Sequence, residues 1–322
     1  MEYDYKSLGL SEAELFAPYE HNDLDAEKIT APRYSYWASV FRVFFRKKLN
    51  IAILILLAVV IVFAYAYPAV AGYDRFANVT LQETHHLTPE KAFSVLGPSI
   101  RNILGTGGAG NPTFDAIWYG SSISLSLAFI CAAINMTIGV IVGAIWGFSK
   151  KVDAVMMVVY NIVGNVPYLL IVAVLVMLFS PSFWTLVFAM TVTGWMGIAY
   201  SMRIQVIIIR DREYNLASKC LGTSTVKIAM KNILPFMTSI IVTMLATEIP
   251  SYIGSEVFLS YIGLGMSEPS LGRLIYEAKD AMLTPGWEWE FWSPVAISAV
   301  ITVILYMVGQ SLGDASDPRT HM

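Results

Sequence analysis

Residues 210 to 235 read RDREYNLASKCLGTSTVKIAMKNILP, a charged segment that lies between two apolar stretches of membrane-spanning length. Tyr214, Ala217 and Leu221 occupy the i, i+3 and i+7 positions of one helical face. Gly222 follows directly and can end that helix in the left-handed conformation. The segment therefore predicts a short amphipathic helix, a glycine turn and a second helix, offered to a partner between two membrane spans.

The composition places the chain in a lipid bilayer. Of its 322 residues, 56% are hydrophobic and only 14% are charged, and the mean hydropathy is +0.59. Such a chain has too little polar surface for a soluble globular protein. A helix that crosses the hydrocarbon core needs about 20 apolar residues. The stretches that meet this requirement are Leu49–Ala71, Ile123–Phe148, Ala154–Phe179, Phe183–Met202, Ile233–Ile253 and Phe291–Leu312. We therefore predict an all-α integral membrane protein with six transmembrane helices.

Lysine and arginine are distributed unevenly over the segments between these spans. With a cytoplasmic N-terminus, only five of the 21 basic residues fall on the outer side. Those residues are Arg75, Lys91, Arg101, Arg273 and Lys279. The opposite orientation would reverse the bias, so both termini and the 210–235 segment are predicted to be cytoplasmic.

The spans divide the chain into an inner arm, a helical bundle and two long outer loops. The arm ends in an aromatic and basic stretch that is typical of an interfacial helix. The outer loops suggest a docking surface, although the first is rich in Gly, Pro and Asn and can equally be a simple connector. The predicted boundaries are 1–48 for the arm, 49–71 for the first span, 72–121 for the first outer loop, 122–313 for the remaining bundle with an inner loop at 204–235 and an outer loop at 254–290, and 314–322 for the cytoplasmic tail.

The inner loop resembles the EAA loop of ABC importer permeases. The family's Glu-Ala-Ala, Gly and Ile-Leu-Pro elements correspond in spacing to residues 216–218, Gly222 and residues 233–235. Leu216 replaces the family's carboxylate, so either Glu213 takes its place or the contact is less ionic. The resemblance implies that an ATPase subunit binds this coupling loop. The contact residues that it implies are Arg212, Glu213, Tyr214, Ala217, Ser218, Cys220, Leu221, Gly222, Thr223 and Ser224.

Motifs outside this loop are similar to those of the dipeptide, oligopeptide and nickel permeases. Residues 256–265 read EVFLSYIGLG, and an aromatic run follows at 287–292. Further similar positions are Gly105-Thr106, 117–125, Pro269, Gly272 and 313–319, whereas Gly107 to Pro112 replaces the family's usual charged residues. The resemblance extends over roughly residues 32–322 and is strongest to the C-type membrane subunit of oligopeptide importers from Gram-positive bacteria. It implies the type I ABC importer permease fold.

Polar residues within the spans indicate a pathway through the bundle. A carboxylate in a spanning helix costs about 2.5 to 3.5 kcal/mol on insertion scales, so it usually faces a cavity or a partner. Glu248 is such a residue and stands beside Pro250, which interrupts the helical hydrogen bonds. An alternative is that Glu248 is neutral or hydrogen-bonded at a subunit seam. The predicted pathway residues are Glu248, Ser251, Ser255, Glu256, Asn161 and Asn165.

Other features are predicted to be structural. A stripe of small residues should pack against another helix, namely Gly139, Gly143 and Gly147. Cys131 lies in a span and Cys220 in the coupling loop, so the two cannot pair. The adjacent His85-His86 pair on the first outer loop has no further ligand nearby, so we predict no metal site.

No catalytic constellation is visible in the sequence. Residues 105–110 are rich in glycine but lack the lysine of a P-loop and are predicted to lie outside the cell. We therefore predict that the chain is not an enzyme, and that ATP and Mg are bound by partner subunits. The resemblance implies a second, B-type permease subunit, two cytoplasmic ATPase subunits, an external lipid-anchored peptide-binding protein and a peptide substrate, without nucleic acid.

The function implied is that of a membrane subunit that moves oligopeptides across the bacterial cytoplasmic membrane by alternating access. One alternative is a permease for nickel or another small solute, because that branch shares the motifs. Another is a receptor or scaffold that binds a ligand outside and signals through the coupling loop without transport. A secondary carrier is less compatible with six unequal spans that lack an evident inverted repeat.

Overall fold

The structure is a computed structural model that describes residues 36–72, 98, 103–108 and 110–316. The start of the arm, most of the first outer loop with its histidine pair, and the tail from residue 317 lie outside the described residues. The chain divides into two units, Met1–Ser39 and Val40–Met322. In the described part the chain is helical apart from turns and an isolated β-bridge between Thr106 and Pro112. The helix predicted for the arm is present as α3 (Tyr36–Arg46).

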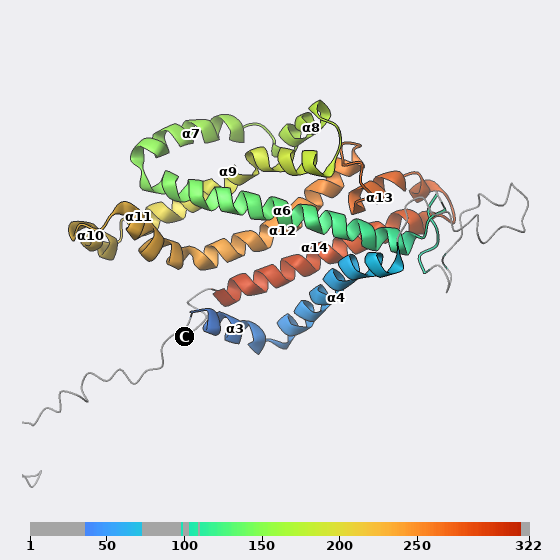
Figure 1. Ribbon diagram of the computed structural model, residues 1–322, viewed down its shortest axis with the longest axis horizontal. Coiled ribbons are helices and arrows are strands. Elements are labelled where there is room, and N and C mark those ends of the chain that lie inside the picture. Colours follow the sequence, from blue (N-terminus) through green and yellow to red (C-terminus); the bar gives the residue numbers. More distant parts are fainter. Residues whose placement is uncertain (1–35, 73–97, 99–102, 109, 317–322) are drawn as a thin grey trace, which may run out of the picture. The chain divides into compact units, whose positions relative to one another are not determined.

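Within the described residues, five helices are long and apolar enough to cross a membrane (Figure 1). They are α4 (Lys48–Ala71), α6 (Thr113–Phe148), α9 (Phe183–Arg210), α12 (Thr238–Tyr261) and α14 (Glu288–Ser316). Each contains most of one predicted apolar stretch. Such stretches form helices in lipid because a helix satisfies its backbone hydrogen bonds internally. Five of the six predicted spans are therefore confirmed, and the one that contains α12 extends over Lys231–Tyr261 with two short helical turns ahead of α12.

The remaining predicted span, residues 154–179, is a bent pair of helices. α7 (Lys150–Gly164) and α8 (Tyr168–Leu178) meet at 75°, and together they have the length and apolarity of one span. The apolar stretch predicted over 154–179 is therefore present as two helices that bend between Gly164 and Tyr168. Pro167 has no amide proton and disfavours helical backbone at Val166, so the helix ends before it. α8 then begins at Tyr168 with Pro167 as its N-cap.

Two spans extend further outward than predicted. α6 begins at Thr113, directly after Pro112, and so takes up the end of the predicted outer loop 72–121. α12 continues past residue 254 and ends before Gly263, which adopts a left-handed φ of 85°. A short helix, α13 (Leu271–Glu277), and a 3-10 turn (Ala281–Leu283) then follow at the outer end.

α6 packs closely along α9 through the predicted glycine stripe. A Cβ atom on Gly139, Gly143 or Gly147 would lie 2.5–2.6 Å from atoms of α9, closer than any van der Waals contact allows. The two helix backbones can approach this closely only because these positions carry no side chain. The prediction that the stripe serves packing is therefore confirmed.

The core lies where α6, α9 and α12 meet. Leu125 and Cys131 of α6, Met190 of α9 and Ile253 of α12 have no exposed surface. Cys131 is thus buried in a span, as predicted, whereas Cys220 is exposed in the coupling loop.

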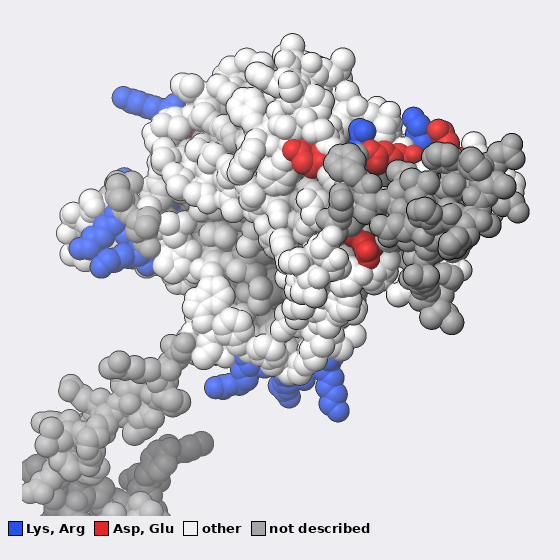
Figure 2. All heavy atoms as spheres, turned by 45° about the vertical axis from the view of Figure 1, so that its right-hand side comes forward, with Lys and Arg blue, Asp and Glu red and all other residues white. Residues whose placement is uncertain are grey.

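Basic and acidic side chains are concentrated at different ends of the bundle (Figure 2). Lysine and arginine gather at the end that carries α10 (Glu213–Cys220) and α11 (Thr225–Ile228), where α7 also begins. Acidic side chains are concentrated at the other end, which carries α13. The positive-inside rule therefore favours a cytoplasmic position for α10 and an external one for α13.

Candidate functional site

A pocket of about 370 Å³ lies between the α7–α8 bend, α9 and α12. Apolar side chains form much of its wall, and glycines at 164, 194 and 197 leave the space open. The polar side chains that line it are Tyr160, Tyr168, Thr193, Glu248, Ser251 and Tyr252. An apolar cavity with a few convergent polar groups is the usual form of a small-molecule site. In the described part of the chain, no group of three or more His, Cys, Asp or Glu residues is arranged to hold a metal ion.

A set of hydrogen bonds crosses the bundle beside Glu248. Tyr252, one turn later on α12, lines the same pocket as Glu248. Asn135 of α6 donates its amide to the Tyr252 oxygen at 2.6 Å and to the Met190 carbonyl at 3.3 Å. Tyr168 of α8 donates to the same carbonyl at 3.0 Å. A connected buried network holds its members in one arrangement, so Tyr252 and Tyr168 have fixed positions in the wall beside Glu248.

Asn135 and Thr193 were not identified from the sequence. Asn135 is fully buried, and its side-chain oxygen, like the hydroxyl of Thr193, has no hydrogen-bond partner among the described residues. A Cβ atom on Gly194 would lie 2.6 Å from the Asn135 amide, so glycine is required there. The position of Asn135 within a predicted span was a usable signal. A polar amide inside a spanning helix needs a partner or a cavity, as a carboxylate does.

The predicted pathway residues do not all reach this pocket. Glu248 and Ser251 line it. Ser255 lies one turn beyond Ser251 and donates to its carbonyl at 2.9 Å. Asn161 and Asn165 are exposed at the end of α7, where the Asn165 amide donates to the Asn161 carbonyl. The two asparagines therefore belong to the bend in this chain and are not part of the pocket wall.

Glu256 is enclosed by serines. Of the predicted pathway residues, it is the one whose position departs most from the prediction. Its side chain is 0% exposed and accepts hydrogen bonds from Ser124 at 2.9 Å, Ser260 at 2.9 Å and Ser270 at 2.5 Å. Ser270 is also the N-cap of α13. A buried carboxylate is tolerated when donors surround it in this way. Glu256 thus holds α13 on the bundle and does not line the pocket at Glu248.

The coupling loop forms the predicted helix, glycine turn and second helix. Gly222 has a left-handed φ of 81° directly after α10. Its amide donates to the Lys219 carbonyl at 3.0 Å, and the Thr223 amide donates to the Ser218 carbonyl at 3.1 Å. This pair of bonds is the Schellman motif, which ends a helix and redirects the chain. The direction in which α11 leaves α10 therefore depends on Gly222.

One face of α10 is left uncovered by the rest of the chain. Tyr214 and Ala217 are exposed, and Leu221 is 86% exposed. Phe236 adds to the same surface, because its ring centroid lies 6.0 Å from that of Tyr214. Leu216, the residue in place of the family's carboxylate, is exposed on another side of α10, where it lines a separate pocket with Lys150 and Arg210. An exposed apolar patch bordered by charges is typical of a protein interaction site.

Asn215 connects α10 to the following span. It is almost fully buried, donates to the Ile209 carbonyl at 2.8 Å and accepts a hydrogen bond from Asn232 at 3.2 Å. Asn232 lies in a π-helical turn, Ala229–Ile233, which a 3-10 turn, Leu234–Met237, joins to α12. Between α11 and α12 the chain thus passes through a π-helical turn and a 3-10 turn and does not form one continuous α-helix. Single π turns are frequent at functional sites.

An ion pair joins α7 and α9 near the same end of the bundle. Arg203 binds Asp153 through two parallel hydrogen bonds, one of them 2.9 Å between Nη2 and Oδ2. The Trp146 indole donates to Asp153 at 2.7 Å, which adds α6 to the group. Two-pronged pairs of this kind are among the stronger ion pairs. This pairing could not be predicted from the sequence, since 50 residues separate the two charges.

Comparisons with known proteins match the chain along most of its length. Residues 136–322 match the family described as "Binding-protein-dependent transport system inner membrane component", and residues 35–89 match the "N-terminal TM domain of oligopeptide transport permease C". The oligopeptide transport system permease protein AmiD of Streptococcus pneumoniae (strain ATCC BAA-255 / R6) is 43% identical over 96% of this chain and 98% of its own length. The oligopeptide transport system permease protein OppC of Bacillus subtilis (strain 168) is 34% identical over 95% of this chain and 97% of its own.

A solved structure with a similar fold is described as "Inward facing conformations of the MetNI methionine ABC transporter". Its TM-score is 0.50 at 16% identity, and the match covers 62% of this chain and 96% of that chain. At this identity the likeness shows the fold alone, and it agrees with the permease fold predicted from the motifs. The chain belongs to the family of binding-protein-dependent transport system inner membrane components and is a multi-pass protein of the bacterial cytoplasmic membrane.

Proposed function

We propose that this chain is one of two different membrane subunits of an ATP-driven importer of short peptides. The names of its relatives support the substrate class, because an oligopeptide permease is 43% identical over nearly the whole chain. The match of residues 35–89 to the N-terminal domain of an oligopeptide permease supports the same class. Two cytoplasmic ATPase subunits bind ATP and Mg, and this chain carries no chemical step.

The pocket at Glu248 is the observation that supports the proposed transport pathway. Free peptides have an ammonium group at one end and many polar backbone groups, and a path for them needs acceptors without strong binding. Glu248 offers one carboxylate, while Ser251 and Thr193 offer hydroxyl groups within the same 370 Å³. The hydrogen bond from Asn135 to Tyr252 fixes the part of the pocket wall that lies beside these groups. The facing half of the pathway comes from the second, B-type permease subunit.

The exposed face of α10 is the observation that supports the proposed coupling of this chain to the ATPase. We assign the segment from Arg212 to Ser224 to a cleft of one ATPase subunit, which draws the segment inward when the ATPases close on ATP. The Asn215–Asn232 contact passes this movement to the π-helical turn and to α12, on which Glu248 lies. Moving a two-state equilibrium from 1:99 to 99:1 takes about 5.5 kcal/mol of differential interaction, which ATP binding by the partners supplies. The pocket then opens alternately outward and inward.

An external, lipid-anchored peptide-binding protein delivers the substrate in this proposal. The family description, which names dependence on a binding protein, supports this partner. The outer surface formed by the Gly105–Thr113 turn, α13 and the start of α14 offers it a place to dock.

Uptake by cells tests the proposal. A strain lacking this chain, with and without a plasmid copy, is given labelled di-, tetra- and hexapeptides and, separately, labelled nickel. We expect the plasmid copy to restore ATP-dependent uptake of at least one peptide and not of nickel. Restored nickel uptake without peptide uptake would assign the chain to a metal importer. Restored peptide sensing without stoichiometric uptake of any solute would assign it to a receptor.

A further inference from the structure

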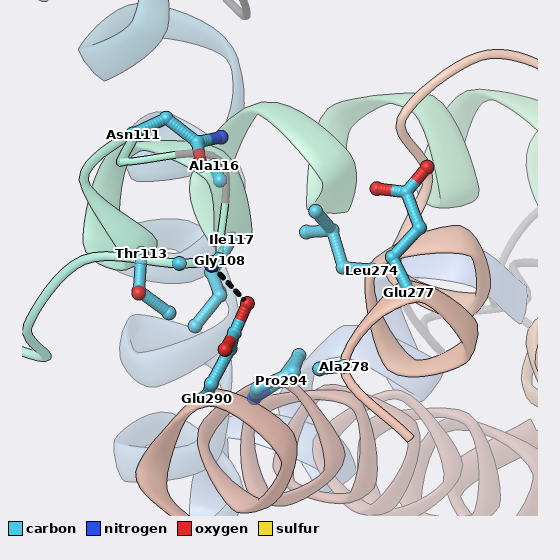
Figure 3. A pocket seen from close by; sticks show the side chains of 11 residues that line it. Gly108, Asn111, Thr113, Ala116, Ile117, Leu274, Glu277, Ala278, Glu290 and Pro294 are labelled. Atoms are coloured by element: carbon cyan, nitrogen blue, oxygen red, sulfur yellow. Dashed lines mark hydrogen bonds between the residues drawn. The ribbon is translucent and has the colours of Figure 1, made fainter. Parts of the chain in front are cut away.

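Cavities at both ends of the bundle lie outside the proposed transport pathway. The outer one has a volume of about 410 Å³ and lies between the turn at residues 107–111, α6, α13 and α14 (Figure 3). Its two carboxylates are already engaged within the chain, because Glu277 pairs with Arg273 at 2.7 Å and Glu290 accepts a hydrogen bond from the Gly108 amide at 2.7 Å. A cavity at the inner end differs from it, since the basic side chains there have no such partners.

This inner cavity lies between the junction of α3 with α4 and the last turns of α14. It has a volume of about 450 Å³, and its polar lining consists of Arg46, Lys47, Asn50, Ser311 and Asp314. The start of α4 and the end of α14 lie at the end of the bundle that carries α10 (Figure 1). The distribution of basic residues favours the cytoplasmic side for this end. Pockets for small organic groups measure about 300–1,000 Å³, so the inner cavity is large enough to hold one.

Arg46 and Lys47 bring unpaired positive charge to the inner cavity. Both side chains are exposed, and neither has an ion-pair or hydrogen-bond partner among the described residues. They belong to the stretch at 41–48, FRVFFRKK, which contains four basic residues and no acidic one. Asp314 is the one acidic residue of the lining, and it accepts a hydrogen bond from Gln310 at 3.1 Å. The lining therefore has a net positive charge.

A buried asparagine fixes the turn that carries these two residues. Lys47 has an extended backbone between the two helices, with φ −88° and ψ 116°. The side-chain amide of Asn50, a residue that is 5% exposed, donates to the Phe44 carbonyl at 3.1 Å. The Asn50 backbone amide donates to the Lys47 carbonyl, also at 3.1 Å. Arg46 and Lys47 are thus presented at the cavity by a defined break between α3 and α4.

Exposed apolar side chains stand beside the basic residues of the cavity. Phe45 precedes Arg46, and Leu49 precedes Asn50, and both apolar side chains are exposed. α4 continues with the exposed Ile55 and Val62, which face hydrocarbon when this helix spans the membrane. The same helix therefore begins with positive charge at the level of lipid headgroups and continues with apolar surface at the depth of acyl chains.

The chemistry of the inner cavity fits the headgroup of an anionic phospholipid. Arginine and lysine are the side chains that bind phosphate oxygens, and basic pockets between spans on the cytoplasmic side bind anionic headgroups. Ser311 and Asp314 add a hydroxyl group and a carboxylate acceptor, which match a headgroup that carries hydroxyl groups beyond its phosphate. A soluble anion would leave the neighbouring apolar side chains in water, whereas a lipid covers them.

We propose that the inner cavity binds the headgroup of phosphatidylglycerol, or of an anionic phospholipid with the same chemistry, from the cytoplasmic leaflet. The phosphate lies against Arg46 and Lys47, and the headgroup hydroxyls reach Ser311 and Asp314. The acyl chains follow the exposed side of α4. The bound lipid joins the α3–α4 junction to the end of α14, because both line the cavity. The inference depends on the membrane location of the chain and not on its peptide substrate.

The test measures lipid binding to the full chain, purified in detergent together with its partner subunits. Native mass spectrometry gives the fraction of protein that carries phosphatidylglycerol at each lipid concentration. Phosphatidylethanolamine and phosphatidylcholine with the same acyl chains, and free glycerol 3-phosphate, are measured in parallel. The variant is Arg46→Gln with Lys47→Gln. Arg42→Gln with Lys48→Gln is the matched control, because these exposed residues of the same stretch remove the same charge but do not line the cavity.

We expect Arg46→Gln with Lys47→Gln to raise the dissociation constant for phosphatidylglycerol about tenfold. The control variant should remain within about twofold of the unmodified protein. Both other lipids should bind the unmodified protein about tenfold more weakly than phosphatidylglycerol does. The unfolding temperature and the subunit content should be the same in both variants, because all four replaced side chains are exposed.

Four results would overturn the inference. An equal loss of binding in the control variant would show a general attraction of the basic stretch for the membrane. Equal affinity for the three lipids would show that the headgroup is not recognised. Displacement of the lipid by an equal concentration of glycerol 3-phosphate would assign the cavity to a soluble anion. A crosslink between Lys47→Cys and a cysteine at Asp25 or Glu27 that prevents lipid binding would assign it to this chain's own acidic arm.

Discussion

Asn232 donates its side-chain amide to the side-chain oxygen of Asn215 across 3.2 Å, and this contact joins the exposed helix α10 to the turn that leads into α12. Asn215 is almost fully buried, while its neighbours on α10 are exposed. The contact therefore links the surface that we assign to the ATPase with the span that carries Glu248. The π-helical turn around Asn232 offers a place where the link can bend.

Replacing Asn232 with alanine should uncouple ATP hydrolysis from uptake. The change leaves Asn215 without this partner, and a buried hydrogen-bonding group left unsatisfied costs about 1–3 kcal/mol. We expect ATP hydrolysis in proteoliposomes to continue while the number of peptides imported per ATP falls several-fold. Asn161→Ala is the matched control, because Asn161 is an exposed asparagine of α7. An unchanged ratio in Asn232→Ala would remove the contact from the coupling path.

Gly222 gives a test of the glycine turn itself. A β-branched residue in the left-handed conformation costs about 1–2 kcal/mol, whereas asparagine tolerates that conformation. No other atom lies within 4 Å of the position where a Cβ atom would be, so only the backbone opposes a side chain. We expect Gly222→Val to insert normally but to bind the ATPase poorly, and Gly222→Asn to remain close to the unmodified protein. Co-purification of the ATPase measures both, and equal binding by the two variants would contradict the role of the turn.

Glu248 should be needed for transport and not for insertion. Removing a charge from a spanning helix lowers the cost of placing it in lipid by about 2.5 to 3.5 kcal/mol, so Glu248→Gln should reach the membrane in normal amount. We expect peptide uptake to fall, with the largest loss for peptides that keep a free ammonium group. N-acetylated peptides serve as the control substrate. Full uptake with unchanged preference would assign Glu248 to packing at a subunit seam.

The orientation of the spans can be measured by labelling single cysteines from outside intact cells. In a Cys220→Ser background, cysteines at Lys150 and Lys227 should be shielded from an impermeant reagent, because both positions lie at the basic end of the bundle. A cysteine at Asp280 should react, because this residue is exposed beyond α13, and Asn78, outside the described residues, is predicted to react as well. Labelling at Lys227 would reverse the topology on which both proposals depend.

The spans and the glycine turn could be predicted because they depend on local sequence. Apolar length marks a spanning helix, and Gly222 stands where the amphipathic face of α10 stops. The bend before α8 also has a local signal, because Pro167 disfavours helical backbone at the residue before it. Tertiary contacts had no such signal, and the 132 residues between Ser124 and Glu256 show why.

The two glutamates of α12 show most clearly what could not be predicted from the sequence. In the sequence, Glu248 and Glu256 are both predicted pathway carboxylates, about two helical turns apart. The structure opens one to a pocket and encloses the other among three serines, two of which come from other parts of the chain. Burial of a carboxylate is therefore evidence for a partner or a cavity, and only the packing decides between them.

This difference predicts opposite phenotypes for the same substitution. Glu256→Ala leaves the hydroxyls of Ser124 and Ser270 without their acceptor and frees the start of α13, which should cost on the order of 1–3 kcal/mol for each group left unsatisfied. We expect a lower unfolding temperature in detergent and faster proteolysis of the outer loop, whereas Glu248→Ala should change neither. Glu256→Gln should lie between the two, because its amide keeps one acceptor oxygen but turns a donor toward the remaining serines. If Glu256→Ala were as stable as the unmodified protein while peptide preference changed, Glu256 would belong to the pathway after all, and the serine enclosure would describe only one state of the transport cycle.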